Sequence, residues 1–300
     1  MIPSRERSPT EFVRAAMRRR VTAVFNDATK GERPVMRRAD ALFPPDSVAW
    51  RVHGDVVCML TGGIASLMLQ MLHPKVLAGV WDHSDFRADM HGRLKRTAKF
   101  ISVTTFDSAP RAEALLERIN AIHGQVRGVL PNGEPYDALD PRLLAWVHVT
   151  EAMCFLEGWR RYGEPDMSRA DQDRYFDEMA RIAGPLGADP IPRSRGEAEA
   201  FIQIMRPELV SDERTQEVRD LVLRQNLGAW HTAPAARVIM AAGVDLLPAW
   251  ARQLHRLPRS PVDAFAAAQA KAMARTVRWA YATSANVRVW PQDVREFPWR

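Results

Sequence analysis

The chain has 300 residues, of which 46% are hydrophobic and 26% charged, and both values are ordinary for a globular protein. Its 42 basic and 36 acidic residues give a net charge of +6, spread along the chain apart from Arg18-Arg19-Arg20, so no concentrated basic face predicts nucleic-acid binding. The two cysteines, Cys58 and Cys154, lie in apolar sequence without CxxC partners, which excludes a cysteine-rich zinc module and a disulfide scaffold.

Two segments, the N-terminus and the longest apolar run, bear on where the protein is found in the cell. The first residues, MIPSRERSPTEF, are charged and lack an apolar core, so we expect no secretory signal and a cytoplasmic protein. The longest apolar run, residues 56–72, is interrupted by small and polar residues. It is short for a membrane span and favours a buried core helix.

Helix signals dominate the chain and predict an all-α fold of about ten helices. Start signals include the capping box at Ser8–Glu11, Ser108, Asp140-Pro141, and serines followed three residues later by an acid at Ser168, Ser194 and Ser260. The expected helices span residues 9–25, 55–72, 75–81, 89–106, 110–126, 140–162, 169–183, 195–206, 212–226, 234–255 and 261–283. Residues 31–50 and 128–137 are expected to be loops, the second with a Pro-Asn-Gly turn.

The chain reads as one continuous domain. No strand alternation is convincing, since residues 287–289 are too few, and no repeat or long linker divides the sequence. Within this domain we distinguish an N-terminal helix and loop at 1–54, a core at 55–230, and C-terminal helices at 231–300 that pack on the core.

Several polar residues stand out against this helical background. Arg93 and Thr97 are four residues apart and share a helix face, where a guanidinium beside a hydroxyl suits an anion or a polar ligand. His123 and His148 lie in apolar helical sequence. Each is either a hydrogen-bonded core residue or a ligand of haem iron. HExxH, P-loop and GxSxG motifs are absent from the sequence.

Four short sequence blocks, taken in their order along the chain, resemble those of a known protein family. They are LMLQMLHPKVLAGVWDHSDF, GRLKRT, INAIHGQVRG and DPRLLAWVHVT, all within about residues 55–230. Together they resemble the family of rubber oxygenases (latex-clearing proteins) and MpaB-type oxygenases. The resemblance implies an α-helical fold with a globin-like core that binds haem b.

The resemblance also assigns roles to residues. The iron ligand falls on His123 in the block His123-Gly124-Gln125-Val126-Arg127-Gly128, and the distal Arg-x-x-basic-Thr block falls on Arg93, Arg96 and Thr97. If His123 is not the ligand, His148 is the next candidate and His83 follows it. Rubber oxygenases have lysine where this chain has Arg96.

The distal glutamate of rubber oxygenases has no evident counterpart. The sequence has no Glu between Glu32 and Glu113, so we expect Asp82, His83 or Asp85 to take that role, or the role to be vacant. This difference moves the expected function away from rubber cleavage.

Two functions follow from the resemblance. The first is a haem b-dependent oxygenase that uses dioxygen on a small apolar substrate, such as an isoprenoid, terpenoid or aromatic molecule, with cleavage of a C=C bond as the suggested reaction. The second is a non-catalytic haem-binding protein, a carrier or gas sensor on the same fold. The sequence leaves the oligomeric state open.

Overall fold

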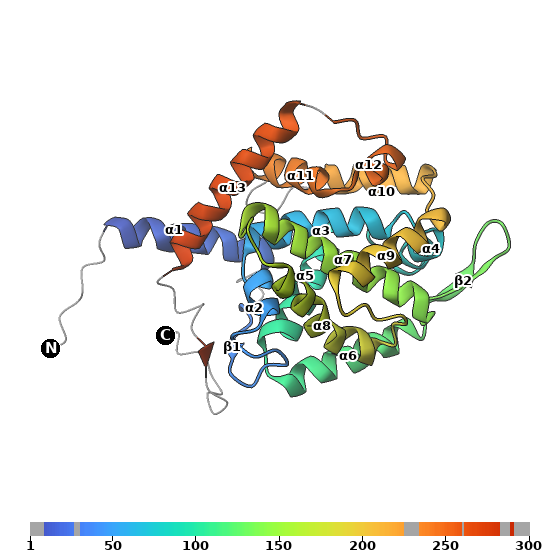
Figure 1. Ribbon diagram of the computed structural model, residues 1–300, viewed down its shortest axis with the longest axis horizontal. Coiled ribbons are helices and arrows are strands. Elements are labelled where there is room, and N and C mark those ends of the chain that lie inside the picture. Colours follow the sequence, from blue (N-terminus) through green and yellow to red (C-terminus); the bar gives the residue numbers. More distant parts are fainter. Residues whose placement is uncertain (1–8, 27–30, 225–233, 260, 283–288, 291–300) are drawn as a thin grey trace.

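The computed structural model describes residues 9–26, 31–224, 234–259, 261–282 and 289–290 (Figure 1). This part of the chain contains 13 α-helices and is predominantly all-α, as the sequence predicts. The helices are α1 (Pro9–Phe25), α2 (Val48–His53), α3 (Val56–Gln70), α4 (Pro74–His83), α5 (Met90–Phe106), α6 (Ala109–His123), α7 (Pro141–Tyr162), α8 (Arg169–Leu186), α9 (Arg195–Met205), α10 (Glu213–Leu223), α11 (Pro234–Leu246), α12 (Ala249–Leu254) and α13 (Pro261–Tyr281), with a 3-10 turn, η2 (Arg206–Glu208).

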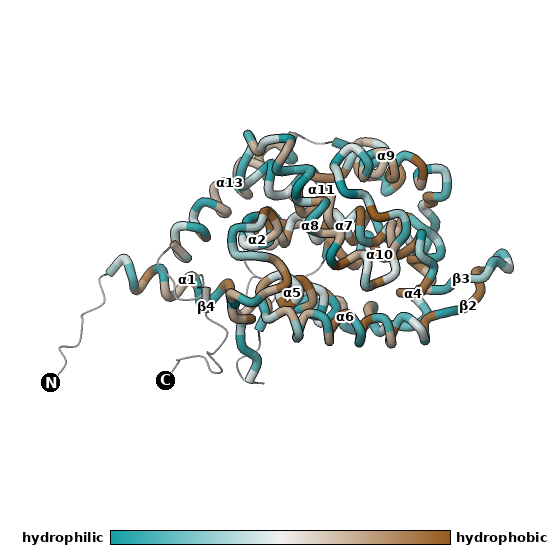
Figure 2. The backbone as a smooth tube through the Cα atoms, turned by 60° about the horizontal axis from the view of Figure 1, so that its bottom comes forward, coloured by the Kyte–Doolittle hydropathy of each residue, from teal (hydrophilic) through white to brown (hydrophobic). Residues whose placement is uncertain are grey.

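Four short strands form two small pairs. β1 (Arg37–Arg38) pairs in parallel with β4 (Val289–Trp290), and β2 (Arg127–Val129) pairs with β3 (Pro135–Asp137) as an antiparallel hairpin. The expected loop at 128–137 is therefore largely a hairpin that turns at Pro131-Asn132-Gly133, with Gly133 at φ 90°. In both views α1 and the β2–β3 hairpin project from opposite ends of the helical body (Figures 1 and 2).

N-terminal caps explain why many helices begin where the sequence predicts. Asp140, Ser168 and Ser194 each accept a hydrogen bond from a backbone N–H in the first turn of the following helix. Ser108 was expected to cap α6, but its side chain makes no cap bond; instead the Asp107 carboxylate accepts from the Ser108 N–H. The expected caps at Ser8 and Ser260 lie outside the described residues.

One expected helix is interrupted by proline, and one expected loop ends earlier than predicted. The helix expected at 234–255 breaks into α11 and α12 because Pro248 has no N–H with which to continue the helical bonding. The region expected to be loop until residue 50 ends earlier, since α2 begins at Val48. There the Glu178 carboxylate of α8 accepts hydrogen bonds from the N–H groups of Val48 and Ala49 at 3.2 and 2.8 Å.

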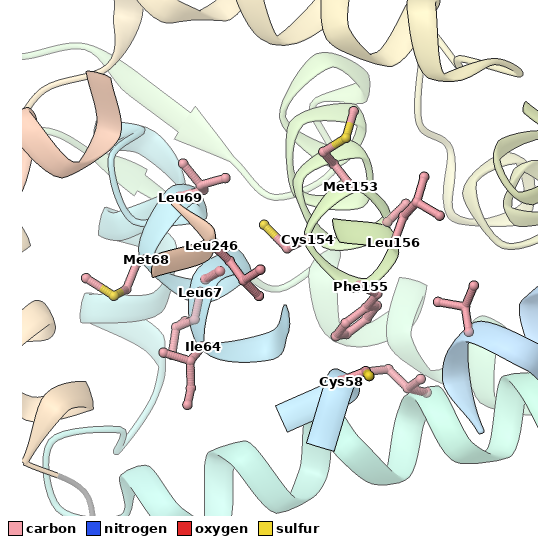
Figure 3. Packing of buried hydrophobic residues seen from close by; sticks show 14 of the residues in the cluster. Cys58, Ile64, Leu67, Met68, Leu69, Met153, Cys154, Phe155, Leu156 and Leu246 are labelled. Carbon is pink, nitrogen blue, oxygen red and sulfur yellow. The ribbon is translucent and has the colours of Figure 1, made fainter. Parts of the chain in front are cut away.

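The centre of the molecule is the antiparallel pair α3–α7. The backbones approach closely at Gly62 and Gly158, where an added Cβ would lie 2.7 Å from the carbonyl oxygens of Cys154 and Cys58 respectively. Gln70 Nε2 donates to the Val147 carbonyl at the other end of the pair. Figure 3 shows side chains of both helices in the hydrophobic cluster that they share. The apolar run of α3 is thus a buried core helix, as expected.

The remaining helices surround this pair. α11 and α13 pack on α3, α8 and α9 pack on α7, and α5 packs on α6 and α2. Residues from α1 through α13 contribute to one hydrophobic cluster, which also encloses the free thiols of Cys58 and Cys154.

No single helix in the described ranges is both long and apolar enough to cross a membrane. α3 and α4 meet that test only as a pair, and the pair is bent by 104° at its junction.

Candidate functional site

A helical hairpin brings Arg93, Thr97 and His123 to one end of the molecule. Arg93 and Thr97 lie near the start of α5, α6 packs against α5, and His123 is the last residue of α6. The chain reverses at residues 107–108, so positions about 14 residues before and after the turn lie at the same end, roughly 20 Å from it. The order of elements therefore gathers the expected distal block and the expected iron ligand, although no hydrogen bond between described residues joins them.

The end of α4 is hydrogen-bonded to the segment that follows α6. Tyr136 of β3 donates a hydrogen bond from its hydroxyl to Asp82 Oδ2 at 2.7 Å, and His83 Nε2 lies 3.2 Å from both the Tyr136 hydroxyl and the Arg127 carbonyl oxygen. Burial, together with the hydrogen bond to Asp82 and its charge, raises the pKa of Tyr136 to about 12. The structure thus holds Asp82 and His83 in contacts that fix the β2–β3 hairpin to α4.

The distal block on α5 divides into a partly buried and an exposed part. Arg93 is partly buried, and burial and then the charge of Arg96 lower its pKa. Arg93 Nη1 donates a hydrogen bond to Ser84 Oγ at 3.5 Å, and no carboxylate among the described residues pairs with Arg93. Arg96 is exposed and pairs with Asp89 at 3.4 Å. Thr97 is also exposed, and its hydroxyl donates to the Arg93 carbonyl at 3.2 Å.

His123 occupies a helix end, where the sequence placed it inside a helix that continued to residue 126. α6 stops because Gly124 takes the C-cap position and its N–H bonds back to the Asn120 carbonyl. The helical periodicity of residues 110–126 predicts that Ile122 faces inward beside His123, but Ile122 is 49% exposed, so that prediction is wrong. His123 itself is partly buried, burial lowers its pKa, and its Nδ1 is buried without a hydrogen-bond partner.

His148 lies within the bundle on α7. It is 9% exposed, burial lowers its pKa to about 4, and its buried Nε2 has no partner. His91, at the start of α5, likewise has a buried Nδ1 that no described residue bonds. Buried polar atoms are normally hydrogen-bonded, so three such imidazoles on α5, α6 and α7 indicate unused ligating or donating capacity.

These residues fit haem b better than a free metal ion. The described residues contain no cluster of three or more His, Cys, Asp or Glu side chains arranged to hold a metal ion. Haem needs only one protein ligand to its iron, which a single neutral imidazole with a free nitrogen supplies. It also carries two propionates, and Arg93 is a partly buried cation that no carboxylate among the described residues pairs with.

The sequence reasoning missed Glu151, one turn after His148 on α7. Burial raises the pKa of this carboxyl to about 7, and no described residue donates a hydrogen bond to it or forms an ion pair with it. A signal was present in the sequence: Glu151 is the single acid between Asp140 and Glu157, in the mainly apolar middle of α7.

A polar hollow of about 340 Å³ lies elsewhere, at the start of α2. Its lining comprises Arg37, Pro45, Asp46, Ser47, Val48, Trp50, Arg51, Asp171 and Arg174. None of the expected site residues belongs to it.

Comparisons with known proteins address the family. The family model for the catalytic domain of the ER-bound oxygenase mpaB/B′ and rubber oxygenase matches residues 50–297, which is most of the chain. Comparisons with curated proteins and with solved structures found no significant match.

Proposed function

The chain belongs to the family of the mpaB/B′ and rubber oxygenase catalytic domains, and from this membership we propose that it is a haem b-dependent oxygenase acting on a small apolar molecule. The family identifies the protein as an oxygenase, and dioxygen is therefore one of its substrates. The observation that supports haem is the partnerless, partly buried imidazole of His123 at the same end of the α5–α6 hairpin as the carboxylate-free cation Arg93. A cytoplasmic location remains a prediction.

In this proposal, His123 and the residues of the distal block bind the cofactor and its ligand. Haem b, when bound, supplies the redox-active iron that activates dioxygen. His123 would hold the cofactor as its single protein ligand, with His148 as the alternative. Its lowered pKa keeps the imidazole neutral near pH 7, the form that binds metals. Arg93 would neutralise a propionate or orient a polar group of the ligand, and Thr97 and Arg96 would lie at the outer edge of this region.

The proposed substrate is a small or medium apolar molecule such as a prenyl chain, a terpene or an aromatic compound. α3 and α7, which form the centre of the fold, are lined by aliphatic, aromatic and sulfur-containing side chains. Apolar pockets between helices typically enclose most of a ligand's surface. Asp82 is already bonded to Tyr136, and no glutamate lies on α4 or α5, so the rubber-type distal glutamate has no counterpart there. Cleavage of a C=C bond by dioxygen is the reaction we propose.

The experiment measures haem content and then turnover. Protein from haem-supplied cells should carry one haem and show a Soret band. His123→Ala should lose this haem, whereas His83→Ala, at an exposed position, should keep it. Haem lost from His148→Ala but retained by His123→Ala would move the ligand to α7.

Substrate class is tested with the same preparation. Carbonyl products from short isoprenoids, and none from polyisoprene latex, would support the proposal. Products from latex alone would contradict it. Haem bound without dioxygen consumption on any apolar substrate would favour the carrier or sensor alternative.

A further inference from the structure

We infer that the polar hollow at the start of α2 binds a small molecule through a phosphate group, at a site separate from the region proposed for haem. Three arginines from three elements line this hollow: Arg37 of β1, Arg51 of α2 and Arg174 of α8. Carboxylates of the protein balance the second and the third of these charges. No described carboxylate balances Arg37, and this cation beside a hollow carries the inference.

Arg51 and Arg174 each form ion pairs within the fold. Arg51 Nη2 lies 2.7 Å from Asp171 Oδ2, and its Nε lies 3.4 Å from Glu164 Oε2. Arg174 Nε lies 2.9 Å from Glu178 Oε1, and its two Nη groups donate to no described residue. The pairs hold both guanidiniums beside the hollow, and Arg174 keeps donors with which to bind a ligand.

Arg37 has aromatic rings for neighbours instead of acids. Its guanidinium carbon lies 4.5 Å from the centre of the Phe106 ring and 5.8 Å from that of the Trp50 ring. Burial lowers the pKa of Arg37, which is the opposite of what a nearby carboxylate would do. Stacking on a ring uses the face of a guanidinium, so the N–H groups along its edge stay available for an oxyanion.

The wall of the hollow holds further donors without acceptors. Trp50 is 5% exposed, and its indole Nε1 is buried and bonds no described residue. The Ser47 hydroxyl accepts from the Trp50 N–H at 3.2 Å, and its own proton has no acceptor in the described part of the chain. Buried donors are normally bonded, so this wall has more donors than its own acceptors use.

Two acids lie along the lining, and neither balances Arg37. Asp171 is paired with Arg51. Asp46 is exposed and forms no ion pair with a described residue. A carboxylate at this position repels a bound anion, so removal of the Asp46 charge should strengthen anion binding.

The hollow suits a phosphate better than a carboxylate. A carboxylate is planar and matches the fork of one arginine, whereas a phosphate group has several oxygens and can accept from guanidiniums of different elements at once. A volume of about 340 Å³ is in the range of small-molecule sites and leaves room beside the phosphate for an organic group. Pro45 and Val48 add apolar side chains to the lining. The ligand expected is therefore an organic phosphate of modest size.

The hollow is distant from the region proposed for haem. Phe106, beneath Arg37, is the last residue of α5, and Arg93 lies near the first, about 20 Å away along the helix. In both views α2 lies across the helical body from the β2–β3 hairpin (Figures 1 and 2), whereas His123 lies shortly before that hairpin. The inference therefore does not rest on the proposed function, and anion binding can be measured without haem or turnover.

The test titrates the full-length protein with inorganic phosphate at constant ionic strength and measures binding by calorimetry. Saturable binding at one site is expected. Arg37→Met keeps an unbranched side chain against the rings but removes the charge, so it should raise Kd by at least about tenfold. Asp46→Asn should lower Kd by about twofold. The matched control Arg193→Met removes an exposed arginine that does not line the hollow, and its Kd should equal that of the unchanged protein.

A second variant and a second readout cover the case in which Arg37→Met fails to fold. Arg37→Lys keeps the charge but loses the planar fork, so its Kd should lie between those of the other two proteins. Saturating phosphate should raise the melting temperature of the unchanged protein by a few degrees, because the ligand binds the folded state, and should raise that of Arg37→Lys by less. Acetate should bind more weakly than phosphate.

Three results would overturn the inference. They are the absence of saturable phosphate binding, acetate binding as tight as phosphate binding, and a Kd that is unchanged in the Arg37 variants. Phosphate binding that is lost in Arg93→Met but kept in the Arg37 variants would place the anion in the region proposed for haem. None of these results bears on the oxygenase proposal, which the haem and turnover measurements test.

Discussion

Arg93 and Arg96 lie three residues apart on α5 and face different surroundings. Arg93 is partly buried and no described carboxylate pairs with it, whereas Arg96 is exposed and bound to Asp89. Identity alone does not distinguish them, since both are arginines in one short block. Burial does, because a guanidinium removed from water needs an anionic or polar partner, and a solvated one does not.

A matched pair of substitutions tests this difference. Arg93→Met retains the length of the side chain but removes the charge, so haem retention should fall by about tenfold, the value of one hydrogen bond to a charged group. Arg96→Met should leave haem retention nearly unchanged, because an exposed ion pair contributes little. The rate at which haem leaves each variant is measured by its transfer to apomyoglobin. Equal rates for the two variants would remove Arg93 from the cofactor site.

At the scale of elements, the close approach of α3 and α7 depends on glycine at particular positions. An added Cβ at Gly62 would lie 2.7 Å from the Cys154 carbonyl oxygen and 3.0 Å from the Phe155 Cα, both backbone atoms that cannot rotate away. At Gly63, the next residue, the nearest atom is Phe155 Cε1 at 3.7 Å, an ordinary contact.

Gly62→Ala should therefore separate the central helices and lower the free energy of unfolding by roughly 1–3 kcal/mol, the usual range for overpacking. Gly63→Ala should be neutral or stabilising by up to about 1 kcal/mol, since alanine loses less entropy in a helix. Urea unfolding measures both changes in free energy, from the shift of each variant's midpoint when the dependence of the free energy on urea concentration is unchanged. A Gly62→Ala variant as stable as Gly63→Ala would mean that α3 and α7 pack less closely than described.

Across the whole molecule, interior groups make stability depend on pH in two opposite directions. Glu151 has its pKa raised from 4.5 to about 7, so the folded state holds a proton that the unfolded state releases, and stability is lost as pH rises from 4.5 through 7. His148 has its pKa lowered from 6.5 to about 4, so its contribution is present above pH 6.5 and is lost as pH falls toward 4.

Glu151→Gln removes the first of these effects and leaves the second. Relative to the unchanged protein, the variant should gain up to roughly 3 kcal/mol in free energy of unfolding between about pH 5 and about pH 8, from the shift of about 2.5 units in Glu151. The loss of stability on the acid side should remain in both proteins. Denaturant unfolding at several pH values measures the difference, and a difference that is constant with pH would mean that Glu151 is ionised in the folded protein.

Helix boundaries were the part of the fold most open to prediction, because their signals are local. Asp140-Pro141, Ser168 and Ser194 cap α7, α8 and α9 as expected, since each bond spans only two or three residues. The missed boundaries had local signals too, namely Gly124 after α6 and Pro248 between α11 and α12. The start of α2 is different, because Glu178, some 130 residues away, bonds its first N–H groups.

The sequence by itself determined the helical class, most helix starts and the family to which the chain belongs, because periodicity, caps and the ordered blocks are written in neighbouring residues. Only the tertiary structure decided that Arg93 is partly buried and Arg96 exposed, that Asp82 and His83 are bonded at the hairpin, that Ile122 faces solvent, and that no described residue bonds Glu151. Burial and partnership arise between elements far apart in the chain, and they set the pKa and the binding capacity of a side chain.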